Sequence, residues 1–131
     1  MVDDELPTGK EIVATHDELE EVYDLKYKGA RVAAPRLDLK RIVQDACDYD
    51  DVYDRAAYLL RNIITAHLFE DANKRTAWTT ILDYLDRHGL EPAKTEKEET
   101  DPVLNAIRAF EIEGISEWLE TGDIDESKFN P

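Results

Sequence analysis

The sequence predicts an all-α fold, a compact bundle of helices with at most a minor short strand or hairpin. Apolar residues recur at three- and four-residue steps along most of the chain, which is the spacing of an amphipathic helix. Alternating strand patterns are missing, although Ile12 and Val13 could form one short edge strand. A chain of 131 residues has the usual size of one domain. We therefore expect a single domain over 1–131, with flexible tails at 1–10 and 123–131.

The first two predicted helices lie in the N-terminal third of the chain. Thr15 and Glu18 have capping-box spacing, and Gly29 is a plausible stop for the helix that they begin. The segment 29–35 then breaks the helical pattern and fits either a mobile flap or a plain interhelical loop. A second helix follows over 37–46. The apolar face of the first helix carries Leu19, Val22 and Leu25.

The next two helices have the clearest pattern in the chain. Apolar residues recur at helical spacing over 52–64, which predicts the buried central helix of the bundle. The same spacing recurs over 77–85, in a helix that closes at Gly89. Arg87 and His88 occupy its last turn, where the helix dipole favours cations.

The C-terminal third predicts two shorter helices. The charged segment 91–100 is expected to be a solvated loop. Thr100 as the cap and Pro102 in the first turn then begin one helix. A last helix carries Ile115 and ends near Gly122.

The chain is strongly acidic, with 16 Lys and Arg against 31 Asp and Glu and a formal net charge of -15. This charge repels phosphate backbones, so we expect no direct nucleic-acid partner. The acidic residues are spread over the whole chain. A halophile's surface has this character, because high salt screens the repulsion between like charges. Ordinary acidic solubility fits the composition equally well.

The cysteine content and the first residues favour a cytoplasmic location. Cys47 is the single cysteine, so no internal disulfide is possible and a reducing compartment fits best. Residues 1–10 are acidic and lack an apolar run, which predicts neither a signal peptide nor a membrane-spanning segment. We expect no membrane partner.

The segment between the two central helices reads His67-Leu-Phe-Glu-Asp-Ala-Asn-Lys-Arg-Thr-Ala77. His67 is expected to continue the apolar stripe of the preceding helix, so that its ring emerges at the edge of the core. An imidazole there could take the proton of a serine or threonine hydroxyl that attacks a phosphoryl group. A lone histidine at a helix end is more often structural.

The residues after His67 add the other parts of a phosphate site. Asp71 offers a hard oxygen ligand for Mg²⁺. The N-terminus of the next helix attracts anions through its free N–H groups. Its residues are small or able to bind phosphate: Ala72, Asn73, Lys74 and Arg75. Together these residues predict a site for phosphoryl transfer.

Phe69 is the one aromatic residue of this polar loop. We expect its ring to plug into the core and to hold the loop in shape, which is a structural role.

The run 67–77 resembles the signature of the Fic/Doc family, in the version of the Doc (death-on-curing) toxins. The resemblance extends through Trp78 to Gly89, and more loosely over about residues 10 to 120. It implies a Fic-like bundle of about six helices. Most Fic enzymes transfer AMP and have a glycine and a second arginine where this chain has Lys74 and Trp78. These two differences mark the Doc branch, for which the resemblance implies transfer of the γ-phosphoryl group.

The resemblance also implies roles and partners. His67 corresponds to the base, Asp71 to the magnesium ligand, and Asn73, Lys74 and Arg75 to the phosphate clamp. The co-substrate would be ATP or another nucleoside triphosphate, with Mg²⁺. The implied target is a hydroxyl of an elongation factor Tu-like GTPase. An antitoxin protein, whose flexible segment folds into a groove near the site, is the implied inhibitor.

Two alternatives remain open at the level of the sequence. The intact His67 and Asp71 could support transfer of AMP instead of a phosphoryl group. The chain could also be a catalytically silent module that binds a nucleotide or an antitoxin. The identity of the transferred group separates the first alternative from the kinase, and binding without transfer would indicate the second.

Overall fold

The structure is a computed structural model and describes residues 6–23 and 28–129. Helices make up all of the regular secondary structure in these residues. The α-helices are α1 (Gly9–Tyr23), α2 (Pro35–Ala46), α3 (Val52–Ala66), α4 (Asn73–Arg87), α5 (Lys97–Asn105) and α6 (Ile112–Thr121). Two short 3₁₀ helices are η1 (Ile107–Ala109) and η2 (Glu126–Phe129). The prediction of an all-α bundle of about six helices is confirmed.

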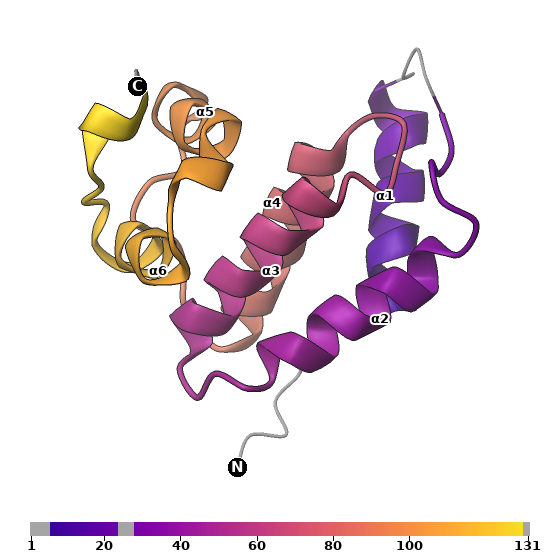
Figure 1. Ribbon diagram of the computed structural model, residues 1–131, viewed down its shortest axis with the longest axis horizontal. Helices are drawn as coiled ribbons and strands as arrows, with labels where there is room; N and C mark the ends of the chain where they lie inside the picture. The colour runs from indigo at the N-terminus through magenta and orange to yellow at the C-terminus, as the bar shows by residue number, and fades with distance from the viewer. Residues whose placement is uncertain (1–5, 24–27, 130–131) are drawn as a thin grey trace.

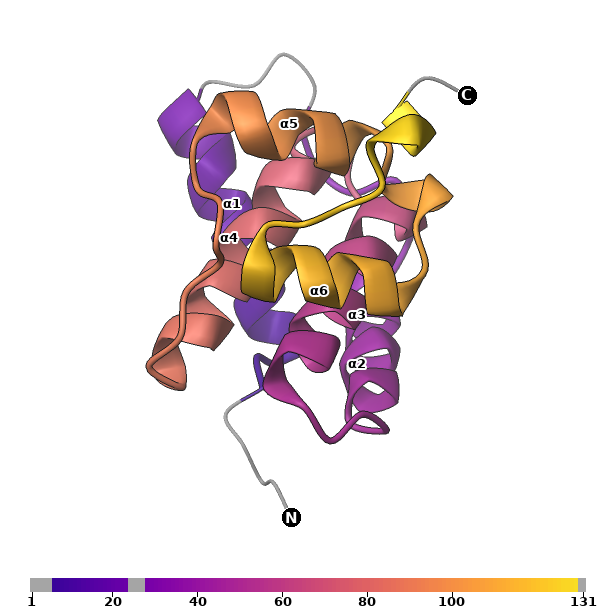
Figure 2. The ribbon, with the colours of Figure 1, turned by 90° about the vertical axis from the view of Figure 1, so that its left-hand side faces the viewer.

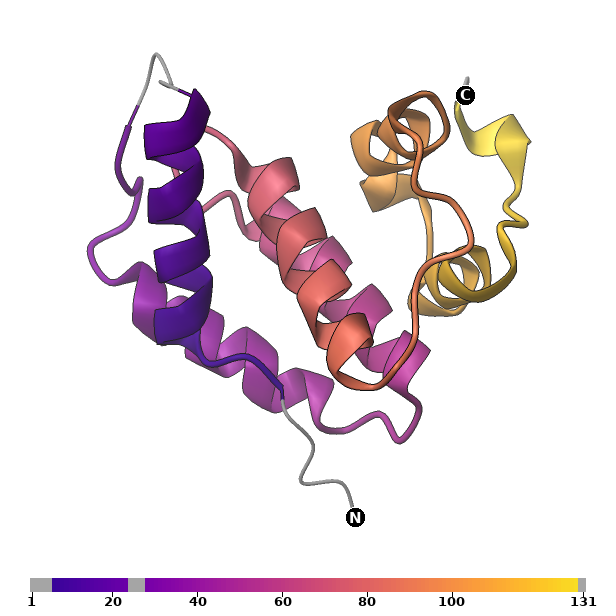
Figure 3. The ribbon, with the colours of Figure 1, turned by 180° about the vertical axis from the view of Figure 1, so that it is seen from behind.

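The helices form three layers, and the middle layer is a pair of helices. α3 and α4 run side by side through the middle, with α1 and α2 on one side and α5 and α6 on the other (Figure 1). Seen from behind, the same central pair lies between the two outer layers (Figure 3). Figure 2 looks onto the outer layer, where α5 lies above α6 and both helices run across the view. Over the described residues, no helix has both the length and the apolar composition needed to cross a bilayer.

α3 is the buried central helix that the apolar repeat predicts. It packs against α2, α4 and α6, so that three of its neighbours share its apolar face. Asp51 caps its first turn, because its carboxylate accepts a hydrogen bond from the Asp54 N–H at 3.1 Å. The buried residues of α3 are Arg55, Ala56, Ala57, Leu59, Leu60, Ile63 and Ile64.

The first helix begins earlier than predicted. The capping box is formed by Thr8 and Glu11: the Thr8 N–H donates to the Glu11 carboxylate at 2.9 Å, and the Glu11 N–H donates to the Thr8 hydroxyl at 3.1 Å. The prediction of a start at Thr15 is wrong, because Thr15 lies inside α1. Ile12 and Val13 also lie in this helix, so the predicted edge strand is wrong as well. Leu25 lies outside the described residues.

Parts of the two predicted tails have regular structure. Residues 6–8 precede α1, and its first residue, Gly9, lies directly against the backbone of Arg36, where any Cβ would collide with the carbonyl oxygen. At the other end, residues 126–129 form η2, and Phe129 packs edge-on against Phe110 at 5.9 Å between ring centroids. The segments predicted as flexible tails, 1–10 and 123–131, therefore include the start of α1 and the whole of η2.

The C-terminal helices were predicted with one error. α5 begins at Lys97, so Thr100 is a buried residue of its second turn and Pro102 lies in the helix interior. Residues 91–96 of the predicted loop lie outside any helix, whereas 97–100 form the start of α5. Glu98 and Glu99 suit its first turn because the dipole favours anions there. α6 ends as predicted, at the left-handed Gly122 with φ 86°.

We predict that Glu11→Ala lowers the free energy of unfolding by about 0.5–1 kcal/mol at neutral pH, since it removes half of the capping box from a partly exposed site. The backbone hydrogen bond from Thr8, with help from Arg87, holds the pKa of Glu11 below its ordinary value of 4.5. The contribution is therefore full above pH 4.5 and is lost as the pH falls through the lower folded pKa.

Urea unfolding of the parent protein and of Glu11→Ala, at pH values above and below 4.5, measures the difference in the free energy of unfolding. Glu18→Ala is the matched control, because Glu18 is an exposed carboxylate of the same helix and lies outside the capping box. Equal losses in the two variants, or a loss that persists in acid, would contradict the capping account.

Candidate active site

The loop between α3 and α4 is bounded by two left-handed residues that are not glycine. α3 ends at Ala66, and His67 follows with φ 53°. Ala72 has φ 64° and directly precedes α4. Residues with side chains rarely adopt this conformation, which costs on the order of 1 kcal/mol at each position. The surrounding packing must therefore hold the loop in place.

The inner side of the loop is apolar, and the side chain of Asn73 bridges its two ends. Phe69 is only 2% exposed, and Leu68 is buried beside it. The Asn73 carboxamide bridges back to Phe69: its oxygen accepts from the Phe69 N–H at 3.2 Å, and its nitrogen donates to the Phe69 carbonyl at 2.9 Å. Both backbone groups of a buried residue are thereby satisfied, and this fixes the width of the loop.

His16 of α1 supports the loop from below, and the sequence analysis did not identify it. Its side chain is 1% exposed and stacks on Phe69, with 3.8 Å between ring centroids and 11° between the planes. Its Nε2 lies 3.0 Å from the Asp71 carbonyl oxygen. Because a carbonyl only accepts, Nε2 carries the hydrogen. The position of His16 one turn beyond Ile12, on the buried face of α1, was the signal available in the sequence.

The connection between α1 and α2 pairs with the same loop. The Arg31 N–H donates to the Leu68 carbonyl at 2.7 Å, and the Glu70 N–H donates to the Gly29 carbonyl at 2.9 Å. These bonds form an isolated antiparallel bridge between Ala30 and Phe69. The segment that fitted a flap or a plain loop is thus a connection attached to the edge of the site.

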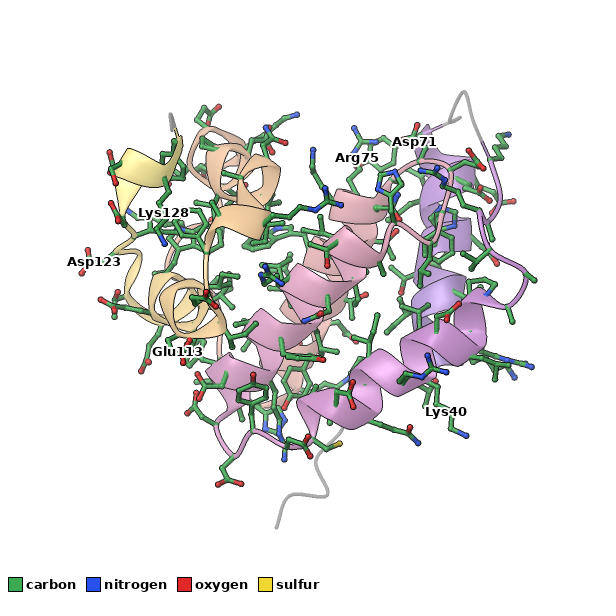
Figure 4. All side chains as sticks on the ribbon, viewed as in Figure 1. Lys40, Asp71, Arg75, Glu113, Asp123 and Lys128 are labelled. Atoms are coloured by element: carbon green, nitrogen blue, oxygen red, sulfur yellow. The ribbon has the colours of Figure 1, made fainter. Side chains whose placement is uncertain are left out.

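The outer side of the loop gathers the predicted polar residues around one open depression. Its lining consists of His67, Glu70, Asp71, Ala72, Asn73, Lys74 and Arg75. Figure 4 shows Asp71 and Arg75 at this end of the molecule, above the central helices. Of the predicted site residues, all but Phe69 line this depression, and Phe69 lies beneath it.

His67 is exposed, and no hydrogen bond to its imidazole is found among the described residues. The prediction that it continues the apolar stripe of α3 is wrong, because its left-handed backbone turns the chain away from the helix axis. The result is a ring that faces solvent at the start of the loop. Such a ring can accept a proton from a bound hydroxyl group.

Asp71 has one carboxylate oxygen engaged and one available. Its Oδ1 accepts the Ala72 N–H at 2.7 Å, and the second oxygen makes no hydrogen bond to the described part of the chain. A single carboxylate oxygen beside a phosphate site is the usual protein ligand of Mg²⁺, which completes its shell with phosphate oxygens and water. The residues present therefore fit this ion.

The start of α4 provides donors for an anion. The first helical bond of α4 joins the Thr76 N–H to the Ala72 carbonyl at 2.9 Å, so the N–H groups of residues 73–75 lack helical partners. No side chain caps this end. The helix dipole adds partial positive charge here.

Two cations stand in the same turn, and residues from other layers hold each one. The Lys74 ammonium donates to the Asn105 side-chain oxygen at 2.6 Å. The Arg75 guanidinium carbon lies 4.3 Å from the centroid of the Tyr23 ring, at the end of α1. Cations at a helix N-terminus oppose the dipole, so this arrangement favours an anionic ligand. Sequence patterns alone did not identify Asn105 or Tyr23.

Trp78 faces away from the depression. Its ring lies 5.9 Å from that of Trp118 on α6, and it is partly buried against the core. The position therefore contributes packing between layers and no positive charge to the site.

A model of the Fic/DOC family matches residues 6–85, and the chain belongs to this family. Among the proteins it resembles is Toxin Doc of Mycolicibacterium smegmatis, which is 28% identical over 111 residues. The match covers 77% of this chain and 82% of that toxin. The family resemblance inferred from the run 67–77, including its Doc branch, is confirmed.

We predict that His16→Ala destabilises the protein by about 3 kcal/mol, because it removes the stacked ring and leaves the Asp71 carbonyl without its donor. His16→Phe restores an aromatic ring and loses only the hydrogen bond, so it should cost about 1–2 kcal/mol. Urea unfolding at neutral pH measures both values. Glu21→Ala, an exposed change on the same helix, should fall within about 0.5 kcal/mol of the parent. Equal stability of His16→Ala and the parent would show that α1 does not hold the loop.

We predict that Ala72→Gly leaves the stability unchanged or raises it by up to about 1 kcal/mol, since glycine relieves the left-handed backbone at this position. Ala14→Gly is the matched control on the exposed side of α1, where the same change should cost about 1 kcal/mol. Thermal unfolding of both variants tests the difference. A comparable loss in the two would show that Ala72 is not strained.

Proposed function

We propose that this protein is a Doc-type toxin that transfers the γ-phosphoryl group of ATP, or of another nucleoside triphosphate, to a serine or threonine hydroxyl of a target protein. An elongation factor Tu-like GTPase is the proposed target. One observation carries the proposal: a free imidazole, a free carboxylate oxygen and an uncapped helix N-terminus with two cations share one opening.

The start of α4 would bind the phosphates of the nucleotide. Three backbone N–H groups point out of the helix there, and Lys74 and Arg75 offset the charge of the phosphate oxygens. The Asn73 side chain already bonds the backbone of Phe69, so its share in the clamp is the backbone N–H. The free oxygen of Asp71 would hold Mg²⁺, which when bound helps to neutralise the phosphate charge.

His67 would act as the general base. As the target oxygen bonds to the γ-phosphorus, the bond from that phosphorus to the bridging oxygen breaks and a nucleoside diphosphate leaves. The hydroxyl proton passes to the imidazole of His67, which has no competing hydrogen bond among the described residues. The exposure of the ring gives a protein substrate access to it.

Phosphoryl transfer is preferred over AMP transfer because of the cations. In the resemblance described above, AMP-transferring relatives have a second arginine at the position of Trp78, and here the indole packs on Trp118. The cations that line the depression are Lys74 and Arg75. Lys74 also replaces the glycine that the AMP-transferring loop contains.

The kinship to a protein named Toxin Doc supports a toxin–antitoxin pairing for this chain. We propose that a second protein, an antitoxin, inhibits it in the cytoplasm through a segment that folds on binding. This partner would account for the tolerance of a toxin by its own cell.

The proposal predicts that γ-labelled ATP with Mg²⁺ labels a purified elongation GTPase, whereas α-labelled ATP does not. His67→Ala should lower the rate by at least about 100-fold, because it removes the base. Asp71→Asn should weaken the dependence on Mg²⁺ and lower the rate strongly. Glu70→Gln is its matched control, since it removes a carboxylate charge from the same loop without removing a proposed ligand.

The outcomes separate the three functions. Transfer of α label would show that the protein is an AMP transferase and that Lys74 does not select the γ-phosphoryl group. Nucleotide binding without any transfer would indicate a catalytically silent module. Equal loss in Glu70→Gln and Asp71→Asn would remove the special role of Asp71.

A further inference from the structure

The described cations that have no partner gather in one part of the molecule. In the region that the structure describes, most Lys and Arg side chains have an ion pair, a hydrogen bond or a ring contact; examples are Arg61, Arg87 and Lys94. The described cations that have none are Lys10, Arg31, Arg36, Lys40 and Arg41. All of them lie in the first turn of α1, in the connection to α2, or on α2.

Three of these cations surround an exposed apolar residue. Lys10, Arg36 and Lys40 line one depression with Leu37, which is 57% exposed. Leu6, Pro7 and Val43 complete its apolar floor, and its described lining contains no carboxylate. An adjoining hollow shares Lys10, Arg36 and Leu37, and the described residues that line it are likewise free of acids. We call Lys10, Arg36, Leu37 and Lys40 the α1–α2 basic surface.

The charge of this surface contrasts with that of the whole chain. Acidic residues outnumber basic ones by 31 to 16, so a basic side chain at an average surface position is expected to have a carboxylate nearby. The region 28–41 has five cations, Lys28, Arg31, Arg36, Lys40 and Arg41, against the single acid Asp38. Ion pairing within the part of the chain that the structure describes therefore does not account for the cations of the α1–α2 basic surface.

The α1–α2 basic surface is separate from the candidate active site. It lies at the start of α1, whereas the loop between α3 and α4 stacks on His16 in the middle of α1 and Arg75 contacts Tyr23 at the end of that helix. Figure 4 shows Lys40 on α2, on a different side of the molecule from Asp71 and Arg75. The connection that carries Arg31 runs between the two places (Figure 1).

We propose that the α1–α2 basic surface binds an acidic segment of a partner protein, with an apolar side chain of that segment against Leu37. Carboxylates of the segment pair with Lys10, Arg36 and Lys40, which have no ion pair with another described residue. The floor formed by Leu6, Pro7 and Val43 receives the apolar side chain. This surface is a docking site in addition to the proposed phosphoryl-transfer site.

A protein segment fits this surface better than a nucleic acid. A phosphate backbone would extend past three cations into the field of a chain with net charge -15, which repels it. A short peptide places its charge only where the cations are. At physiological salt the Debye length is about 8 Å, so the distant carboxylates of the chain are screened while contacts are retained. The exposed side chain of Leu37 can also pack against an apolar side chain of a peptide, which a phosphate backbone does not offer.

The test is fluorescence anisotropy of the full chain at physiological salt with a short labelled peptide of Asp and Glu around one Leu. We expect binding that weakens with salt and is lost when Lys replaces the acids. The variant Lys10→Glu, Arg36→Glu, Lys40→Glu should weaken it by about tenfold or more, as expected from three exposed ion pairs. Leu37→Ser should weaken it at constant charge. Amide chemical shifts should change at the start of α1 and on α2.

The matched control is Lys94→Glu, Lys97→Glu, Lys128→Glu, which makes the same change in net charge on α5, η2 and the loop before α5. Circular dichroism establishes that each variant is folded. Equal weakening in both triple variants, or no binding of the peptide, would overturn the proposal. Tighter binding of a single-stranded oligonucleotide to the same surface would overturn it too, as would self-association through this surface in sedimentation. No nucleotide is present, so the result is independent of phosphoryl transfer.

Discussion

The stack of His16 on Phe69 is the contact on which the candidate active site depends. It fixes the inner side of a loop whose two ends, His67 and Ala72, have left-handed backbones that would not persist alone. The same imidazole bonds the Asp71 carbonyl, and the Asn73 side chain closes the loop from the other end. With its interior satisfied, the loop can leave the imidazole of His67 and one oxygen of Asp71 free for chemistry.

The three layers each contribute to this arrangement. The central layer carries the loop itself, while α1 supplies His16 beneath it and Tyr23 beside Arg75. The outer layer supplies Asn105, which holds the ammonium of Lys74. Two cations at an uncapped helix N-terminus would otherwise repel each other and the helix dipole. Contacts from outside α4 therefore stabilise both cations at the helix end that we propose as the phosphate-binding site.

Local sequence patterns predicted the helices best where the apolar repeat is long. The central helices α3 and α4 follow such repeats, and their positions were found. The sequence around α1 has two pairs with capping-box spacing, Thr8 with Glu11 and Thr15 with Glu18. Local patterns do not decide which pair caps the start of the helix. The hydrogen bonds of Thr8 and the burial of Gly9 against α2 decide between them. The charged face of α5 concealed a short helix, because only a few of its residues turn inward.

By itself the sequence determined the chemistry available to this protein, because a histidine, an aspartate and two cations within a single short run must share one loop. The run also carries the resemblance to the Fic/Doc family, and residues 67 and 71–75 do line one depression. Only the tertiary structure decided which atoms remain free. His16 reaches Asp71 across 55 residues, and Asn105 reaches Lys74 across 31. Likewise, the sequence shows that acids are few over 28–41. Only packing shows that Lys10, Arg36 and Lys40 line one depression with no carboxylate among its described residues. Such contacts join helices that are distant in the chain, so no local spacing specifies them.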